Sequence, residues 1–270
     1  MSLQSWPEIE AITPGHGDRR PEPSNALFGQ SVTLNSAGAS CKLRFGNAGG
    51  GVFEPDHGPL VAGSTTVFEV RPDRFFIDVT PDNQEQGSIC AFLDRIAGRG
   101  IALRMEFPDP VAAATPLQAR FAAHGRLSAV GRTVWNGPVD AGSAGGAGEG
   151  FLQSTALVGL WQRHVYSDTH VYDHMHLNAG RYCWYCHAGP DQGLGDCEES
   201  QCFALGEDLF LFCWQEKLMP CAGIMVEDHA AGRSVGRIAG RNSVTGAHAG
   251  ELVGADIYRL AQIAPYVVAP

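Results

Sequence analysis

The sequence HVYDHMHLNAGRYCWYCH, residues 170–187, predicts two β-strands joined by a tight turn at Asn178-Ala179-Gly180. Aromatic and β-branched residues on both sides of a short turn that contains glycine are typical of a β-hairpin. The same succession of strand, turn and strand recurs in FLDRIAGRGIAL (92–103) and in MVEDHAAGRSVGRI (225–238). Long helical periodicity is absent, and only the Ala-rich residues 110–124 favour one short helix. The chain is therefore expected to be mostly β.

The two halves of the chain resemble each other. VFEVRPDRFFID (67–78) aligns with CFALGEDLFLFC (202–213), and the turn that follows Asp94 aligns with the turn that follows Asp228. The offset stays near 130–135 residues, which is too long for a solenoid repeat. We therefore interpret the pattern as an internal duplication in which each copy is a domain.

The composition of the chain suggests where these domains begin and end. Residues 1–24 are rich in Pro, Gly and charge and predict an irregular N-terminal segment, whereas 136–150 (NGPVDAGSAGGAGEG) has the composition of a flexible linker. The domains are then expected at 25–135 and 151–270. Many short strands joined by hairpins favour an all-β fold of two tandem antiparallel barrels, and a barrel of about eight strands has room for one small ligand.

Charge and hydropathy narrow the choice of partners. The net charge is −10 at pH 7, and such a surface repels phosphate backbones, so we expect no nucleic-acid partner. No apolar stretch reaches the roughly 18 residues of a membrane helix, and the first 20 residues lack the features of a secretory signal. A cytoplasmic location and no membrane partner are expected. In that setting the eight cysteines are predicted to be reduced thiols.

One strand of the 170–187 hairpin carries candidate catalytic residues. Residues two apart share a face of a strand, so Tyr172, His174 and His176 point to one side and Asp173 and Met175 to the other. If the first face lines a barrel interior, Tyr172 and His174 are candidates for proton transfer and His176 for ligand binding. The alternative is a strand whose polar face meets solvent.

The remaining candidates lie on neighbouring strands. Trp214 and Glu216 share one face, and a carboxylate inside a barrel would be a third catalytic candidate, while at the rim it would be an ordinary surface residue. Tyr182 and Trp184 share a face and are predicted to stack on a flat ligand or to fill the core. Arg237 lies within a strand, where a charge needs a partner, and is the candidate anion-binding residue.

Metal-binding and cofactor motifs are incomplete. The His174-x-His176 pair has a spacing that β-barrel metalloenzymes use, but no Glu follows within ten residues to complete a known pattern. Cys183 and Cys186 form a C-x-x-C within a predicted strand, which turns the two sulfur atoms to opposite faces. We therefore expect neither a metal ion nor a cofactor. Nucleotide-binding loops, G-x-S-x-G and H-E-x-x-H are also absent.

Four segments resemble the MoaF family, molybdenum cofactor biosynthesis protein F. They are VYDHMHLNAGRYCWYC (171–186), EDLFLFCWQEK (207–217), AGRSVGRIAG (231–240) and LVGAD (252–256). The resemblance implies lipocalin-like (calycin) barrels in both halves and a link to molybdopterin synthesis. It assigns no reaction.

Three hypotheses about function follow. The first is a protein that binds or processes a small molecule of molybdopterin metabolism, with a pterin or an aromatic acid as its ligand. The second is a lipocalin-fold lyase or isomerase acting on a small aromatic or carboxylated compound. The third is a non-catalytic structural or partner-binding protein, and assembly into a homo-oligomer is compatible with each of them. The first half lacks the H-x-H and W-x-E-K patterns, so we place the site in the second half.

Overall fold

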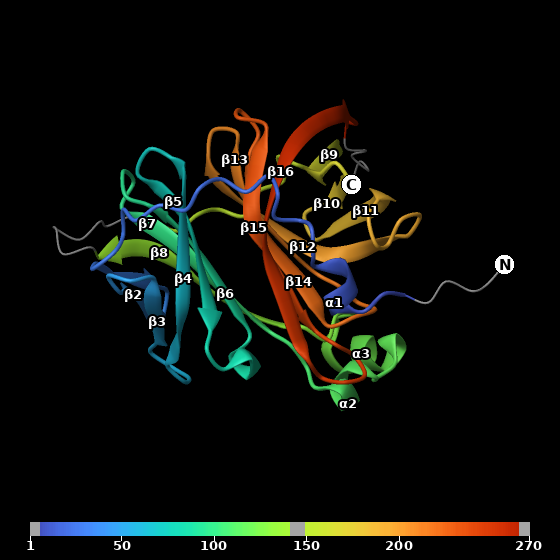
Figure 1. The fold of residues 1–270 in the computed structure, drawn as a ribbon, viewed down its shortest axis with the longest axis horizontal. Coiled ribbons are helices and arrows are strands. Elements are labelled where there is room, and N and C mark those ends of the chain that lie inside the picture. Colours follow the sequence, from blue (N-terminus) through green and yellow to red (C-terminus); the bar gives the residue numbers. More distant parts are fainter. Residues whose placement is uncertain (1–5, 141–148, 265–270) are drawn as a thin grey trace, which may run out of the picture.

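The computed structural model describes residues 6–140 and 149–264, which form two closed antiparallel barrels in tandem (Figure 1). In each barrel every strand pairs with the next one along the chain, and the last strand closes on the first. The strands of the first barrel are β1 (Ser31–Ser36), β2 (Ala39–Phe45), β3 (Gly50–Pro55), β4 (Val61–Arg71), β5 (Arg74–Pro81), β6 (Ser88–Asp94), β7 (Arg99–Glu106) and β8 (Gly131–Asp140). A short 3-10 helix, η1 (Gln84–Gln86), follows β5.

The second barrel repeats this order. Its strands are β9 (Leu160–Ser167), β10 (His170–Asn178), β11 (Arg181–Ala188), β12 (Gly195–Gly206), β13 (Leu209–Gln215), β14 (Cys221–Asp228), β15 (Arg233–Arg241) and β16 (His248–Gln262). The hairpin expected at 170–187 is β10 and β11, paired in antiparallel register. The all-β fold of two tandem barrels is confirmed.

Equivalent turns in the two barrels support the duplication. β5 and β13 are each the fifth strand of their barrel, and each follows a turn in which an aspartate, Asp73 or Asp208, has φ of 56° or 51°. Asp94 and Asp228 end the sixth strand of their barrels, and each accepts a hydrogen bond of 2.9 Å from the backbone N–H three residues later. Two separate barrels thus use the same local chemistry at the same topological positions.

The two barrels pack through their outer faces. Apolar side chains of β5–β7, such as Phe76 and Leu103, form one buried cluster with those of β13–β15, such as Leu211 and Ile224. Because these strands are covered on both faces, their sequences are continuous apolar runs rather than alternating ones. The outer face of β10 takes no part in this cluster. Within the described residues that face stays open, since Leu177 is 47% exposed.

The N-terminal segment belongs in space to the second barrel. Helix α1 (Ile9–Ile12) contacts β15 and β16, and Ile9 is buried. Figure 1 shows this helix, coloured blue, against the strands of the second barrel. The backbone N–H of Gly254 donates to the carbonyl of His16 at 3.0 Å. The N-terminal segment, which the sequence predicts to be irregular, therefore includes an ordered part that covers the second barrel.

The connection between β7 and β8 also packs on the second barrel, where Arg120 Nη2 donates to the carbonyl of Lys217 at 3.0 Å. The Ala-rich segment forms two helices, α2 (Pro110–Ala113) and α3 (Leu117–His124), rather than one. They are separated because Pro116 disfavours the helical conformation at the residue before it. Strand β8 continues to Asp140, so residues 136–140 of the expected linker are part of a strand, and 141–148 lie outside the described residues. No helix in the described ranges is long and apolar enough to cross a membrane.

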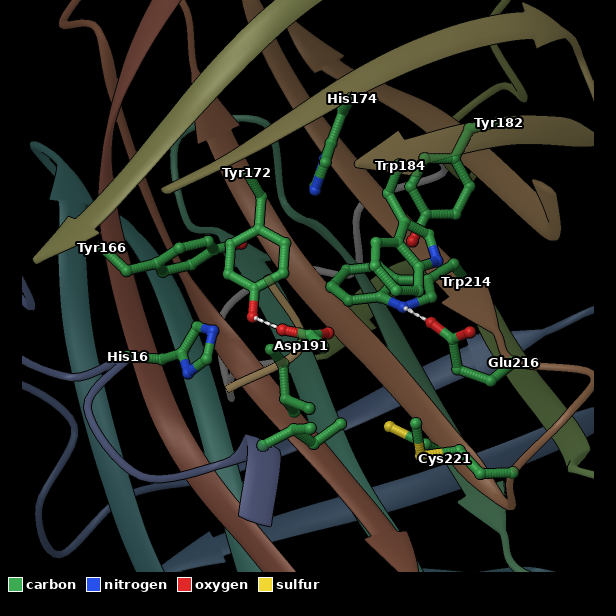
Figure 2. A pocket seen from close by; sticks show the side chains of 13 residues that line it. His16, Tyr166, Tyr172, His174, Tyr182, Trp184, Asp191, Trp214, Glu216 and Cys221 are labelled. Atoms are coloured by element: carbon green, nitrogen blue, oxygen red, sulfur yellow. Dashed lines mark hydrogen bonds between the residues drawn. The ribbon is translucent and has the colours of Figure 1, made fainter. Parts of the chain in front are cut away.

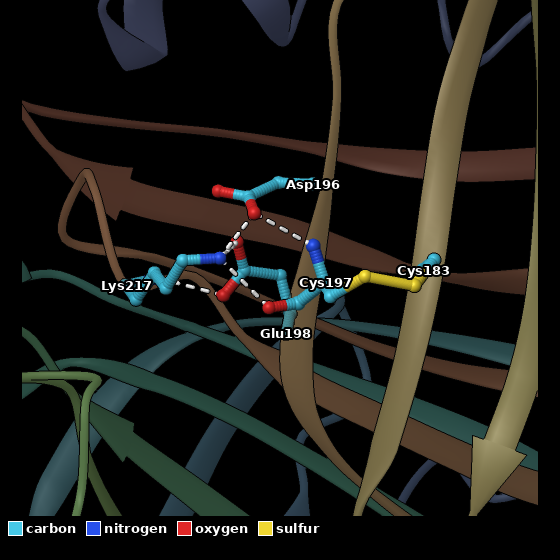
Figure 3. Close-up of a disulfide and its surroundings, with 5 residues drawn as sticks. All are labelled: Cys183, Asp196, Cys197, Glu198 and Lys217. Atoms are coloured by element: carbon cyan, nitrogen blue, oxygen red, sulfur yellow. Dashed lines mark hydrogen bonds and ion pairs between the residues drawn. A yellow bond between two sulfur atoms is a disulfide. The ribbon is translucent and has the colours of Figure 1, made fainter.

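The prediction that all cysteines are reduced is wrong at one pair. Cys183 and Cys197 lie directly opposite each other in β11 and β12 and form a disulfide (Figure 3). The antiparallel register brings them together, although 14 positions separate them in sequence. The other six cysteines are free and buried. Cys186 faces the interior, so the C-x-x-C motif is divided between two faces, as its position in a strand requires.

Candidate functional site

A cavity of about 50 Å³ lies inside the second barrel, at the end that the N-terminal segment covers (Figure 2). Its walls combine aromatic rings with two carboxyl groups. The lining residues are Ile12, His16, Tyr166, Tyr172, His174, Tyr182, Trp184, Asp191, Trp214, Glu216, Met219, Cys221 and Ile238.

Most of the predicted site residues meet in this cavity. Strand parity places Tyr172 and His174 of β10 on the interior face, together with Tyr182 and Trp184 of β11. Trp214 of β13 and Glu216 just beyond it complete the group. Both carboxyl-linked pairs drawn in Figure 2, Tyr172 with Asp191 and Trp214 with Glu216, border the space below His174. Tyr172 and His174 therefore face a cavity inside the barrel. The alternative, in which this face of β10 meets solvent, does not describe the geometry.

His176 shares the interior face but does not line this cavity. Its ring lies 4.8 Å from that of Phe212, centroid to centroid, and its Nε2 lies 3.5 Å from Gln162 Nε2. His176 lies two residues beyond His174 along β10. It lines a separate small pocket together with Leu157 and Cys202. His176, the ligand-binding candidate, therefore does not line the cavity that Tyr172, His174 and Glu216 share.

Arg237 points away from the barrel interior. Its guanidinium donates to Asp78 Oδ2 at 3.3 Å and to Thr80 Oγ1 at 2.9 Å, both on β5 of the first barrel. The reasoning that a charge within a strand needs a partner was sound, but the partner is a carboxylate of the other domain. Its predicted role as the anion-binding residue of this cavity is not compatible with that orientation.

Tyr172 is held by a residue that the sequence did not reveal. Its phenol donates a hydrogen bond to the carboxylate of Asp191, which lies in the loop between β11 and β12 and is buried. Burial and the neighbouring Asp191 charge raise the pKa of Tyr172 far above its usual range, so the phenol stays protonated. Asp191 lies in a Gly-rich loop (GPDQG), where strand parity predicts no orientation.

Glu216 is paired with a second buried carboxyl group, that of Glu198 on β12. The Glu216 Oε1 atom accepts from Trp214 Nε1 at 3.1 Å, and Glu198 Oε2 accepts from the backbone N–H of Lys217 at 2.9 Å. The other oxygens, Glu198 Oε1 and Glu216 Oε2, have no hydrogen-bond partner among the described residues, and the two buried carboxyl groups lie close enough to affect each other's ionisation. Burial raises the pKa of Glu216 to about 7 and that of Glu198 to about 10. The pair therefore holds a transferable proton at neutral pH.

Lys217 compensates part of the negative charge of the carboxyl groups near Glu198. Its ammonium forms ion pairs with Asp196 and, at 3.5 Å, with Glu198 (Figure 3). Glu198 is otherwise enclosed, with a side chain that is 0% exposed. The W-x-E-K sequence thus works as a unit: Trp214 and Glu216 face the cavity, and the lysine supports Glu198 from the opposite side.

His16 closes the covered end of the cavity. Its ring lies 4.7 Å from that of Tyr166 and 4.8 Å from that of His170, centroid to centroid. Burial lowers the pKa of His16 to about 4, so its imidazole is neutral. The sequence indicated no role for this residue, because only the tertiary fold brings an N-terminal loop to the second barrel.

The site can bind a flat polar molecule and exchange protons with it. Aromatic rings provide apolar contact area, while the Tyr172–Asp191 and Glu198–Glu216 pairs offer hydrogen-bond donors and acceptors. The first barrel differs, since its interior is filled with apolar side chains such as Phe53, Phe75 and Trp135.

Comparison with known proteins supports one family. Residues 4–109 match the MoaF N-terminal domain and residues 151–263 the MoaF C-terminal domain. Protein MoaF from Klebsiella aerogenes is 32% identical over 174 residues, which span 63% of this chain and 63% of that protein. The crystal structure of a “putative beta-lactamase” from Burkholderia vietnamiensis is similar over 40% of this chain and 100% of its own, with 13% identity and a TM-score of 0.34, and carries no argument. Since the two domain models match both barrels in order, the chain belongs to the MoaF family.

Proposed function

We propose that the second barrel binds a small, flat, polar molecule of molybdenum cofactor biosynthesis, of the pterin class. The family supports the pathway, because both of its domains are matched in this chain. The cavity supports the chemical class: Trp184 and Trp214 offer rings for stacking, and the carboxyl groups of Asp191 and Glu216 line the same cavity.

The observation that carries the proposal is the Glu198–Glu216 pair inside an aromatic cavity. A pterin ring presents adjacent hydrogen-bond donors and acceptors along one edge. A carboxyl pair that shares one proton can donate to an acceptor and accept from a donor at the same time. Glu216 Oε2 has no hydrogen-bond partner among the described residues, so it is the group that a ligand would meet.

Ligand entry requires the N-terminal segment to move. The cavity of about 50 Å³ is smaller than the roughly 300–1,000 Å³ of typical small-molecule pockets. Its covered end consists of Ile12 and His16, and Trp6 packs edge-on against Trp184 at 5.9 Å between ring centroids. Withdrawal of this segment would enlarge the cavity without any change in the barrel.

The test is calorimetric titration of the full chain with neopterin, and with adenosine as a control of similar size. We expect micromolar binding of neopterin only. Trp184→Ala should weaken it at least tenfold through loss of stacking, and Glu216→Gln should also weaken it. Tyr185→Ala is the matched control, because Tyr185 is the next residue in β11 but is 46% exposed on the outer face. Absence of neopterin binding, or equal affinities for the Trp184 and Tyr185 variants, would refute the proposal.

A lyase or isomerase is the second candidate, favoured by the presence of two proton-carrying pairs in one cavity. Tyr172 would act as the acid on one side and Glu216 as the base on the other. Incubation of a bound compound in D₂O, followed by NMR, would reveal deuterium incorporation or a new product. Tyr172→Phe should abolish the exchange and leave binding in place. Binding without exchange would instead support a carrier role.

A further inference from the structure

Three metal-ligating side chains meet next to the cavity, in the interior of the second barrel. His164 comes from β9, His174 from β10 and Glu227 from β14, and one potential ligand atom of each lies within 4.8 Å of the others. His164 Nε2 is 3.6 Å from Glu227 Oε1. Ligand atoms around a tetrahedral ion with bonds of about 2.0–2.1 Å lie roughly 3.4 Å apart, so one pair already has a suitable spacing. The His174 ring stacks on the His164 ring, with 4.2 Å between their centroids.

The atoms that face one another are buried and lack partners. Both ring nitrogens of His164, Nδ1 of His174 and Oε1 of Glu227 have no hydrogen-bond partner among the described residues. The side chains of His164 and Glu227 are 0% exposed. Buried polar atoms are normally satisfied, so this group of unpartnered donors and acceptors at one point needs a physical explanation.

The second oxygen of Glu227 is fully engaged. Its Oε2 accepts from Gln162 Nε2 at 3.0 Å and from His229 Nε2 at 2.9 Å. These two contacts fix the carboxylate and leave Oε1 directed toward His164. Hydrogen bonds that orient a ligating carboxylate in this way are typical of the surroundings of metal sites.

The local charge favours a cation rather than an ordinary ion pair. Among the described residues, the buried carboxylate of Glu227 has only histidines as ion-pair partners, His229 at 2.9 Å from Oε2 and His164 at 3.6 Å from Oε1. A buried charge needs compensation, and a divalent ion bound by Oε1 would supply it.

We propose that His164, His174 and Glu227 bind a divalent transition-metal ion in the interior of the second barrel. Two imidazoles and one carboxylate form a ligand set suited to zinc or ferrous iron. His174 also lines the cavity, so the open coordination position would face the space where a small molecule binds. The H-x-H spacing in the sequence indicated only His174 of these three residues. His164 and Glu227 lie on strands that only closure of the barrel brings together.

The test is metal binding to the full chain, freed of metal with a chelator and titrated with Zn²⁺ or Co²⁺. We expect one equivalent of either ion, measured by elemental analysis after gel filtration. The Co²⁺ form should show visible d–d absorption without a sulfur-to-cobalt charge-transfer band, because none of the three ligands is a cysteine. This spectrum distinguishes the site from adventitious binding to thiols.

Two substitutions test the assignment of the ligands. His164→Gln and Glu227→Gln should each weaken Zn²⁺ binding at least 100-fold, with circular dichroism showing that the barrels remain folded. His16→Gln is the matched control, because His16 is also buried and borders the cavity but is not among the three ligands, and it should bind zinc like the wild type. If either substituted chain fails to fold, the absorption spectrum of the Co²⁺-loaded wild-type protein tests the proposal by itself. A wild-type chain that binds neither ion, or binding unaffected by both substitutions, would overturn the proposal.

Discussion

Glu198 and Glu216 show how one buried contact sets the chemistry of a site. Neither carboxyl group is accessible enough to be stabilised by bulk water, and each is next to the other, so ionisation of both is unfavourable. The W-x-E-K sequence predicted Glu216, but Glu198 lies on another strand and was missed. Burial raises the pKa of both groups, and repulsion from Glu216 raises that of Glu198 further.

At this scale we predict a specific pH dependence of stability. The pKa of Glu216 is raised by burial from 4.5 in the unfolded chain to about 7, so the folded chain holds a proton that the unfolded chain has released. The associated stability is fully present below about pH 4.5 and is lost as the pH rises through 7. Relative to Glu216→Gln, the wild type should lose roughly 2–3 kcal/mol between pH 5 and pH 8, measured by urea denaturation.

The control for this experiment is Glu22→Gln, because Glu22 is an exposed carboxylate in the N-terminal segment. Its profile should run parallel to that of the wild type. If the Glu216→Gln profile is also parallel, Glu216 titrates as an ordinary carboxylate and the shared proton does not exist.

At the scale of elements, strand β14 makes room for an aromatic ring on β13. Gly223 lies opposite Trp214 in the antiparallel register, and the indole crosses the space above it. A Cβ at position 223 would lie 2.1 Å from Trp214 Cη2. This glycine is therefore required for the close approach of a side chain rather than for backbone conformation.

Gly223→Ala should accordingly displace Trp214 into the cavity. We expect a loss of roughly 1–3 kcal/mol in unfolding free energy from overpacking, together with reduced neopterin binding. Gly206→Ala is the matched control in β12, where a Cβ would meet nothing within 4 Å, and it should change stability by less than about 0.5 kcal/mol. Equal unfolding free energies of the two variants would mean that the indole does not pack over Gly223.

The disulfide between β11 and β12 gives a second prediction about elements. Thiol titration in denaturant without reductant should count six free thiols, and eight after reduction. Replacement of Cys183 and Cys197 by Ser should lower stability by up to about 3 kcal/mol, as expected for a closed loop of this size. A count of eight thiols in non-reducing conditions would show that the bond does not form in the purified protein.

At the scale of the whole molecule, ion pairs of arginines connect the barrels. Arg71 of the first barrel donates two hydrogen bonds of 2.7 Å to Asp228 of the second, and Arg237 of the second barrel reaches Asp78 of the first. Burial raises the pKa of Asp78, and the Arg237 charge opposes this effect. The apolar interface thus contains a carboxylate that depends on a partner from the other domain.

Arg237→Ala should therefore destabilise the folded chain by roughly 3–5 kcal/mol, because Asp78 would remain buried without its partner. Arg233→Ala is the control on the same strand. Its side chain is 68% exposed and lies 3.8 Å from Asp256, so its loss should change stability by less than about 1 kcal/mol. Thermal and urea denaturation of both variants would distinguish the two roles, and similar values would contradict a structural role for Arg237.

The sequence by itself determined the features that depend on local periodicity. Strand type, the tight turns, the duplication and the grouping of Tyr172 with His174 all follow from alternation along one strand and from turn residues. Parity also correctly separated Cys183 from Cys186. These properties concern neighbours in the chain, so no knowledge of the remaining strands was needed.

Only the tertiary structure decided which strands meet. Closure of the barrel brings Glu198 to Glu216 and Glu227 to His164, and the register of two strands places Cys183 opposite Cys197. Packing of the domains decided that Arg237 faces Asp78 and that the N-terminal segment covers the cavity. Alternation along a strand specifies which side chains share a face, but not which distant strand lies across from it, because register and closure depend on the packing of the whole molecule.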